Sequence, residues 1–159
     1  MKFLVSKDIH SNSNFTLLLG FYSLMMLFYF LGDVIYLLNY FGTSVSNVLS
    51  TLKGDPDNFI EPLSLLSLLE HLHISLFLAI LALFTTMAIV LRIKLTHTHK
   101  KIIIILSMSS LLLSVVCLVG TYFVHIAFVY GLIIFELSWH LLGVYALSII
   151  IYQVWIKKP

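Results

Sequence analysis

Four long apolar stretches, separated by short polar segments, dominate the pattern of residues along the chain. They run over about residues 15–40, 62–93, 102–123 and 127–156. A helix needs roughly 20 mostly apolar residues to cross a membrane, because each residue adds about 1.5 Å along a hydrocarbon layer about 30 Å thick. Each stretch meets that length. The pattern therefore predicts an all-α, integral membrane four-helix bundle, and we expect a single transmembrane domain over residues 1–159.

The composition agrees with a membrane protein and excludes several other classes. Hydrophobic residues make up 60% of the 159 residues and charged residues only 10%, with a mean hydropathy of +1.07. A water-soluble globule of this size needs far more polar surface. A net charge of +2 is too small to indicate a nucleic-acid partner. The single cysteine, Cys117, excludes an internal disulfide and a cysteine-rich metal site.

The basic residues indicate how the bundle is oriented. Only Lys53 falls on one side of the four spans. The other eight Lys and Arg residues fall on the opposite side: Lys2, Lys7, Arg92, Lys94, Lys100, Lys101, Lys157 and Lys158. Because basic residues concentrate in cytoplasmic segments, we expect both termini in the cytoplasm. The prediction is a multi-pass protein of the cell's inner (cytoplasmic) membrane, in contact with membrane lipid.

Ionisable side chains inside the spans gather at one depth. Counting about 1.5 Å per residue from the inner end of each span places Asp33, His73 and His140 roughly 25–28 Å along their helices. Charged groups inside a membrane are costly, so their placement there points to function. The complete layer consists of Asp33, Glu70, His71, His73, His125, Glu136 and His140.

Helical spacing divides this layer into faces. Glu70 and His73 are three residues apart and share a face, as do Glu136 and His140, which are four apart. His71 and His73 point about 160° away from each other on a regular helix. A polar and aromatic stripe on the first span consists of Tyr29, Asp33, Tyr36 and Tyr40.

Paired histidines at one depth are typical of a b-type haem held between helices. His73 and His140 are the predicted axial ligands, and His71 and His125 a possible second pair. In composition, helix number and histidine placement, the chain resembles small four-helix membrane b-type cytochromes in general. The resemblance implies electron transfer near the outer face, with haem b as cofactor and a quinone pool or a periplasmic (outer-face) redox protein as partner. It implies that nearby acidic groups tune the haem or move protons: Glu70, Glu136 and Asp33.

Two alternative interpretations remain open. Glu70, His73, Glu136 and His140 offer the mixed carboxylate and imidazole ligands that suit Zn, Fe or Cu. Such a site would support metal-dependent hydrolysis, and the same side chains could instead relay protons or bind a quinone head group. In the other interpretation the protein has no chemistry of its own and is an accessory subunit of a larger membrane complex.

Overall fold

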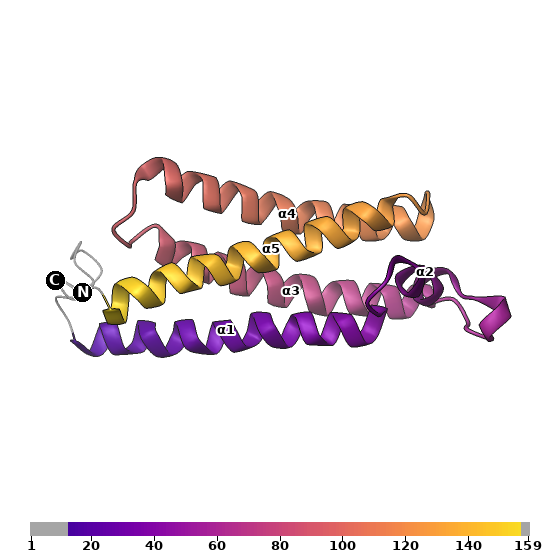
Figure 1. The fold of residues 1–159 in the computed structure, drawn as a ribbon, viewed down its shortest axis with the longest axis horizontal. Coiled ribbons are helices and arrows are strands. Elements are labelled where there is room, and N and C mark those ends of the chain that lie inside the picture. The colour runs from indigo at the N-terminus through magenta and orange to yellow at the C-terminus, as the bar shows by residue number, and fades with distance from the viewer. Residues whose placement is uncertain (1–12, 157–159) are drawn as a thin grey trace.

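The computed structural model describes residues 13–156, and this part of the chain is helical and contains no β-strand. Its four long helices are α1 (Ser13–Phe41), α3 (Leu65–Val90), α4 (His97–Phe123) and α5 (Phe128–Ile151). They alternate in direction along one long axis, and a tight turn joins α4 to α5 (Figure 1). All four are long and apolar enough to cross a membrane. The predicted four-span, all-α architecture is therefore confirmed.

One end of the bundle is covered by a short helix that the hydropathy pattern did not reveal. Helix α2 (Val45–Lys53) and the 3-10 turn η3 (Pro56–Asn58) connect α1 to α3 and lie at the same end as the α4–α5 turn (Figure 1). Ser44 caps α2 because its hydroxyl accepts a hydrogen bond from the backbone N–H of Asn47. Val48 and Leu52 are buried under this helix. We call this end of the molecule the α2 end.

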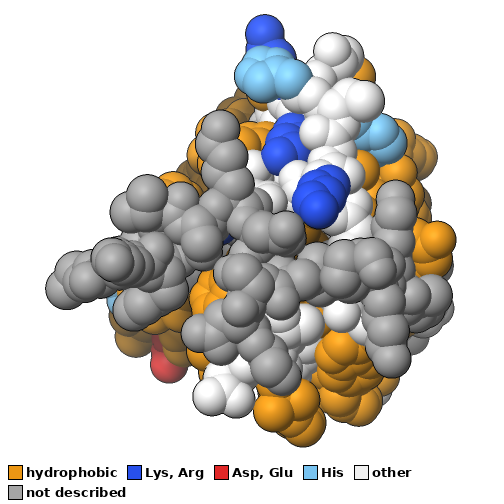
Figure 2. Space-filling model, turned by 90° about the vertical axis from the view of Figure 1, so that its left-hand side faces the viewer, with side chains coloured by type: hydrophobic (Ala, Val, Ile, Leu, Met, Phe, Trp, Pro, Cys, Tyr) orange, Lys and Arg blue, Asp and Glu red, His pale blue; other side chains and the backbone are white. Residues whose placement is uncertain are grey.

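Basic side chains gather at the opposite end, which we call the basic end. Helix α1 begins there, and α5 continues there into one π-helical turn, η4 (Tyr152–Ile156). Figure 2 shows lysine, arginine and histidine side chains on this end of the molecule. The basic residues here are Arg92 and Lys94 in the α3–α4 connection and Lys100 and Lys101 in the first turns of α4. The predicted cytoplasmic anchors Lys2, Lys7, Lys157 and Lys158 lie outside the described residues.

Two helices begin at residues other than the expected ones, because a side-chain hydroxyl caps the N-terminus of each. Helix α3 begins after Ser64, whose side chain accepts from the N–H of Ser67, and not at residue 62. Helix α4 begins after Thr96, whose side chain accepts from the N–H of His99, five residues before the expected start at 102. Each cap satisfies one of the free N–H groups at the helix end, which places the boundary at the capping residue.

The buried apolar side chains form two clusters along the bundle axis. The larger one includes Phe30, Leu83 and Trp139, and extends toward the basic end. The smaller one lies under α2 and includes Leu52 and Leu118. The residues of the candidate site lie where these two clusters meet.

Candidate functional site

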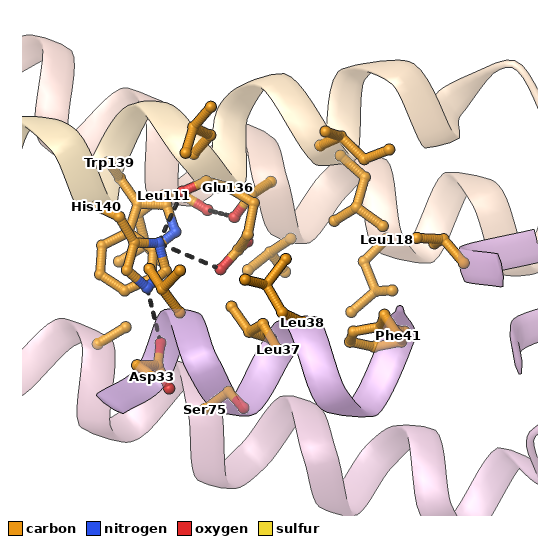
Figure 3. Close-up of a pocket in the computed structure, with 18 of the residues that line it drawn as sticks. Asp33, Leu37, Leu38, Phe41, Ser75, Leu111, Leu118, Glu136, Trp139 and His140 are labelled. Atoms are coloured by element: carbon orange, nitrogen blue, oxygen red, sulfur yellow. Dashed lines mark hydrogen bonds and ion pairs between the residues drawn. The ribbon is translucent and has the colours of Figure 1, made fainter. Parts of the chain in front are cut away.

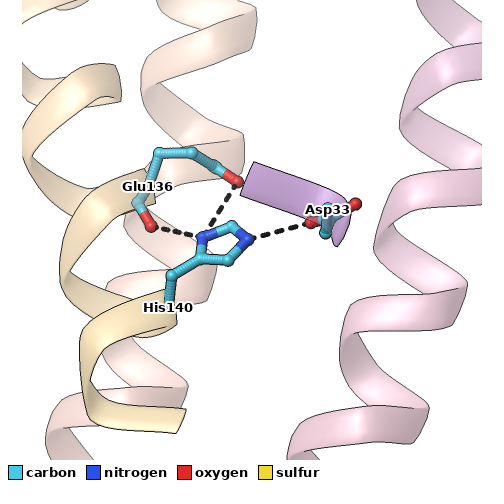
Figure 4. A group of neighbouring side chains, drawn as sticks. All are labelled: Asp33, Glu136 and His140. Carbon is cyan, nitrogen blue, oxygen red and sulfur yellow. Dashed lines mark hydrogen bonds and ion pairs between the residues drawn. The ribbon is translucent and has the colours of Figure 1, made fainter. Parts of the chain in front are cut away.

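A histidine between two carboxylates forms the polar centre of the bundle. His140, in α5, is almost fully buried, at 2% exposed. Its Nε2 atom lies 2.9 Å from Oδ2 of Asp33 in α1. Its Nδ1 atom lies 3.9 Å from Oε1 of Glu136, one turn earlier in α5. Figure 4 shows the imidazole ring with one carboxylate on each side.

The hydrogen bonds of His140 determine where its protons lie. Nδ1 is 2.8 Å from the backbone carbonyl oxygen of Glu136. A carbonyl oxygen only accepts, so Nδ1 carries a hydrogen and donates it. The 2.9 Å bond between Nε2 and the Asp33 carboxyl then needs a second hydrogen. The His140–Asp33 pair therefore holds one transferable proton, either as imidazolium with carboxylate or as neutral imidazole with carboxylic acid.

Glu136 and Trp139 bring further polar atoms to the same place. The Glu136 carboxyl is close to the Ser114 hydroxyl and to the Trp139 indole. The Ser114 hydroxyl donates to the Leu111 carbonyl oxygen. The indole Nε1–H of Trp139 is buried, lies beside the Glu136 carboxyl, and makes no hydrogen bond of normal geometry with any described residue. An unpaired buried donor is costly, so this N–H indicates a place for an acceptor atom.

Close packing of α1 against α5 fixes the His140 ring. Phe30 is fully buried and contacts both Trp139 and His140, with ring centroids 5.7 and 6.1 Å apart. Gly143 lies one turn beyond Trp139, and a side chain there would overlap the Phe30 ring. The absence of a side chain at Gly143 thus allows Phe30 to reach the histidine, and it brings Asp33, one turn further along α1, within hydrogen-bond distance.

A cavity of about 270 Å³ extends from this polar centre toward the α2 end. Figure 3 shows Asp33, Glu136 and His140 at one end of it and Phe41 and Leu118 toward the other. All four long helices contribute to its wall, and Val48 of α2 also lines it. Three of its lining residues also lie on the exposed surface of α1 and α5: Leu38, Ile133 and Leu137. The cavity is therefore an apolar space with polar groups at one end, and it reaches the lipid-facing surface.

His71 also lines the cavity, nearer the α2 end. It is 9% exposed. Its ring stacks on Tyr40 with centroids 5.1 Å apart and an interplanar angle of 3°, and it meets Phe41 edge to face at 5.2 Å. Tyr36 stacks on the same group at 6.1 Å. The tyrosine stripe of α1 thus holds this histidine.

The expectation that His73 turns toward His140 is wrong. His73 and Glu70 are both exposed, on the outer face of α3, whereas His71 is buried. The sequence spacing correctly placed His71 and His73 on different faces, but it did not determine which face meets the other helices. The rotation of α3 that buries Leu68, Ala79 and Leu83 also buries His71. The pair that the structure brings together is His140 and Asp33.

His125 does not join the layer. It lies exposed in the α4–α5 turn, where its Nδ1 accepts a hydrogen bond from the backbone N–H of Ala127. Helix α4 contributes Ser114 to the polar centre instead of an ionisable group. The expected pairing of His71 with His125 therefore has no support among the described contacts.

The arrangement does not fit a haem held by the predicted ligands. His73 is outside the bundle, and both ring nitrogens of His140 are already hydrogen bonded. Two axial histidines would have to face one iron atom. Haem binding therefore stays a prediction from the sequence, and the geometry does not favour it.

A metal ion would need a different ligand set from the one predicted. Glu70 and His73 are not at the centre, whereas single ligand atoms of Asp33, Glu136 and His140 all lie within 4.8 Å of one another. The two carboxyl groups, however, lie on opposite sides of the imidazole (Figure 4). Ligands of one ion must converge on one point, so this order suits proton transfer through the ring better than coordination.

The larger part of the chain matches a known protein family. A family model described as a transmembrane helical domain, Aq_1264_TM, matches residues 42–159. The chain belongs to this family. The match includes α2 to α5, with His71, Glu136 and His140, and leaves out α1, which carries Asp33. No curated protein and no solved structure matches the chain.

The family and the four apolar helices agree on the class of protein. The protein is an integral, multi-pass membrane protein with a transmembrane helical domain. Its apolar outer surface contacts lipid, because large hydrophobic side chains are exposed along all four long helices. Sequence reasoning missed two features of its centre, the direct Asp33–His140 contact and the unpaired Trp139 N–H. The stripe of Tyr29, Asp33, Tyr36 and Tyr40 was the available signal for the first.

Proposed function

We propose that this membrane protein binds a lipophilic molecule with an oxygen-bearing head group, of the quinone or quinol class, in the cavity between its helices. The observation that carries the proposal is the apolar cavity with Asp33, Glu136 and His140 at one end. Binding sites for small molecules are commonly apolar spaces in which a few polar groups converge. The cavity also reaches the surface that faces lipid.

The polar end offers complementary hydrogen bonds to such a head group. The Trp139 N–H is a buried donor without a partner, and a carbonyl oxygen would satisfy it. The Glu136 carboxyl lies beside it and would accept from a hydroxyl of the reduced form. The His140–Asp33 pair holds one proton at this end of the cavity, and the quinone and quinol forms of such a ligand differ by two protons and two electrons. The site is therefore suited to recognise a head group that gains and loses protons.

The exposed lining residues support entry from the membrane. Leu38 of α1 and Leu137 of α5 are 47% and 53% exposed, although both also line the cavity. A hydrocarbon tail could remain between these helices while the head group reaches Glu136. A membrane-dissolved ligand fits this route.

The first experiment is a titration of the purified full-length protein with a short-tail quinone. Trp139 and Trp155 are the two tryptophans of the chain, so a Trp155→Phe variant makes Trp139 the reporter. We expect saturable quenching of its fluorescence. In a parallel titration with the matching quinol, Glu136→Gln should bind at least about tenfold more weakly, because the carboxylate that accepts from the quinol hydroxyl is lost and such a hydrogen bond contributes about 1.5–3 kcal/mol.

Glu70→Gln is the matched control, because Glu70 is an exposed glutamate in the same half of the bundle. Its quinol affinity should equal that of the unaltered chain. Quenching that does not saturate, or equal quinol affinity in Glu136→Gln, would contradict the proposal. Stoichiometric Zn, Fe or Cu in the same sample, lost in Glu136→Gln, would instead support a carboxylate and histidine metal site. An outer-face redox partner, or a larger complex, stays a prediction.

A further inference from the structure

Acidic, basic and histidine side chains are distributed unequally along the length of the bundle. Within the described chain, the stretches 14–32, 74–90, 102–124 and 141–154 contain no Asp, Glu, His, Lys or Arg. These stretches include the helical segments between the level of Asp33 and His140 and the first turn of α4, which carries His97, His99, Lys100 and Lys101. Phe30, Leu83 and Trp139 fill this part of the core. Between the His140–Asp33 pair and the basic end, the titratable side chains of the described chain are tyrosines (Tyr22, Tyr29, Tyr145 and Tyr152), and no carboxyl, imidazole or amine lies there.

A different situation exists toward the α2 end. His71 lines the same cavity as Asp33, Glu136 and His140. Beyond it lie Tyr40, which is partly exposed, and the exposed carboxylate of Glu70. Titratable groups therefore continue from His140 to the surface on this side.

The ring of His71 is held by its faces and not by its nitrogens. It stacks on Tyr40 and contacts Phe41 edge to face, yet its nitrogens make no hydrogen bond with any described residue. More than nine-tenths of the residue is buried. An imidazole whose nitrogens are unpaired can accept a proton at one nitrogen and release another from the second. His71 thus has the chemistry and position of a proton carrier.

We propose that His71 is the group through which the proton of the His140–Asp33 pair exchanges with the α2 end of the membrane. A proton from that side binds one nitrogen of His71, and the other nitrogen releases a proton toward the Asp33 carboxylate. The cavity, at about 270 Å³, has room for bridging water, since one water takes roughly 30 Å³. The titratable groups near His71 are Tyr36 and Tyr40, which stack on its ring, Glu70 on its own helix, and the groups that line the same cavity, Asp33, Glu136 and His140. Val48 of α2 and Leu118 of α4 add no charge to the same wall.

This proposal deepens the proposed function by naming a proton route, and it rests on the shared proton of that site. It can be tested without any ligand. In the purified full-length protein with ¹⁵N-labelled histidine, NMR magnetisation transfer measures how fast the His140 ring hydrogens exchange with water. We expect His71→Phe, which keeps an aromatic ring for stacking, to slow this exchange at least about 10²-fold, the scale of a positioned proton-transfer group.

His73→Phe is the matched control, because the same substitution is made two residues away on the exposed face of α3. The His140 exchange rate should stay unchanged in that variant. An unchanged rate in His71→Phe, or equal slowing in both variants, would overturn the proposed route. His71→Gln provides a second variant if the phenylalanine does not fold, and it should slow exchange in the same way.

The two proposals fail separately in these experiments. Quinone binding is measured in the unaltered chain and in Glu136→Gln, whereas proton exchange is measured without ligand in His71→Phe and His73→Phe. Slowed exchange in His71→Phe together with saturable quinone binding supports the route and the site together. Normal exchange in His71→Phe together with saturable quinone binding would remove the route and leave the proposed function intact. If quinone does not bind but exchange is slowed in His71→Phe, the proposed ligand is wrong and the proton route is still supported.

Discussion

The ring of Phe30 lies where a side chain at position 143 would have to be. Phe30 belongs to α1 and Gly143 to α5, and the ring is fully buried at this crossing. The same ring contacts His140 and Trp139. The approach of the two helices at this point therefore sets the distance between His140 and Asp33, although neither Phe30 nor Gly143 has a polar side chain.

Gly143→Ala is expected to destabilise the bundle by about 1–3 kcal/mol, because the added methyl group forces Phe30 out of its position. Unfolding in mixed detergent measures this difference. Gly32→Ala is the control, since a side chain added at that position of α1 meets no atom within 4 Å. It should show no loss of stability and a gain of up to about 1 kcal/mol. Equal losses in both variants would show that the Phe30–Gly143 contact is not special.

Two substitutions of Asp33 test the shared proton and the hydrogen bond to His140 separately. In Asp33→Asn the amide N–H donates to neutral Nε2 of His140, so we expect little change in stability. Asp33→Ala leaves Nε2 without its partner and should cost about 1–3 kcal/mol. Near neutral pH, ¹⁵N NMR and infrared spectra of the unaltered chain should show an imidazolium or a protonated carboxyl, and Asp33→Asn should show neither. Ionised Asp33 beside neutral His140 would contradict the shared proton.

Substitution at His73 tests the predicted haem ligands. Because His73 is exposed on α3, His73→Ala should leave the unfolding and any bound cofactor unchanged. His140→Ala removes a buried ring that bonds Asp33 and the Glu136 carbonyl oxygen, so it should disturb both. Reduced-minus-oxidised spectra and metal analysis of the two variants provide the measurement. A b-type haem band that disappears in His73→Ala would support the cytochrome interpretation against the geometry described above.

Cysteine labelling tests the expected orientation. Cys117 is buried in α4 and is replaced by alanine, so that single cysteines can be introduced at Ser46 of α2 and Thr98 of α4. Both positions are exposed, at opposite ends of the bundle. With the basic end in the cytoplasm, a membrane-impermeant maleimide should label the Ser46 position in intact cells. The Thr98 position should react only after permeabilisation, and the reverse pattern would invert the topology.

The turn after α2 has a pH dependence of its own. The Asn58 side chain donates to Asp55, and together with the backbone N–H of Asp57 it holds the pKa of Asp55 below its usual value. This stabilising contribution is complete above the usual pKa of an aspartate and is lost as the pH falls through the lowered pKa. Asn58→Ala should raise the pKa of Asp55 toward its ordinary value, which ¹³C NMR titration measures. A pKa that does not move would assign the shift to the backbone bonds.

The sequence predicted the class, the number of spans and the depth of the polar groups. These properties depend on distance along a helix, where each residue adds about 1.5 Å, and an error of two residues changes the depth by only about 3 Å. The α2 helix escaped prediction because it is short and because only two of its residues, Val48 and Leu52, are buried. When hydropathy is averaged over a window as long as a membrane span, a segment this short gives no distinct signal.

By itself, then, the sequence determined that Asp33, Glu136 and His140 share one layer of a four-span membrane protein. Only the tertiary structure decided that Asp33 is the direct partner of His140 and that His71, not His73, faces the cavity. The physical reason is rotation, because one residue turns a helix by about 100°. The face that turns inward depends on contacts between helices, such as Phe30 against Gly143 and His71 against Tyr40. Those contacts join residues that are distant in the sequence, and the order of residues along one helix does not contain them.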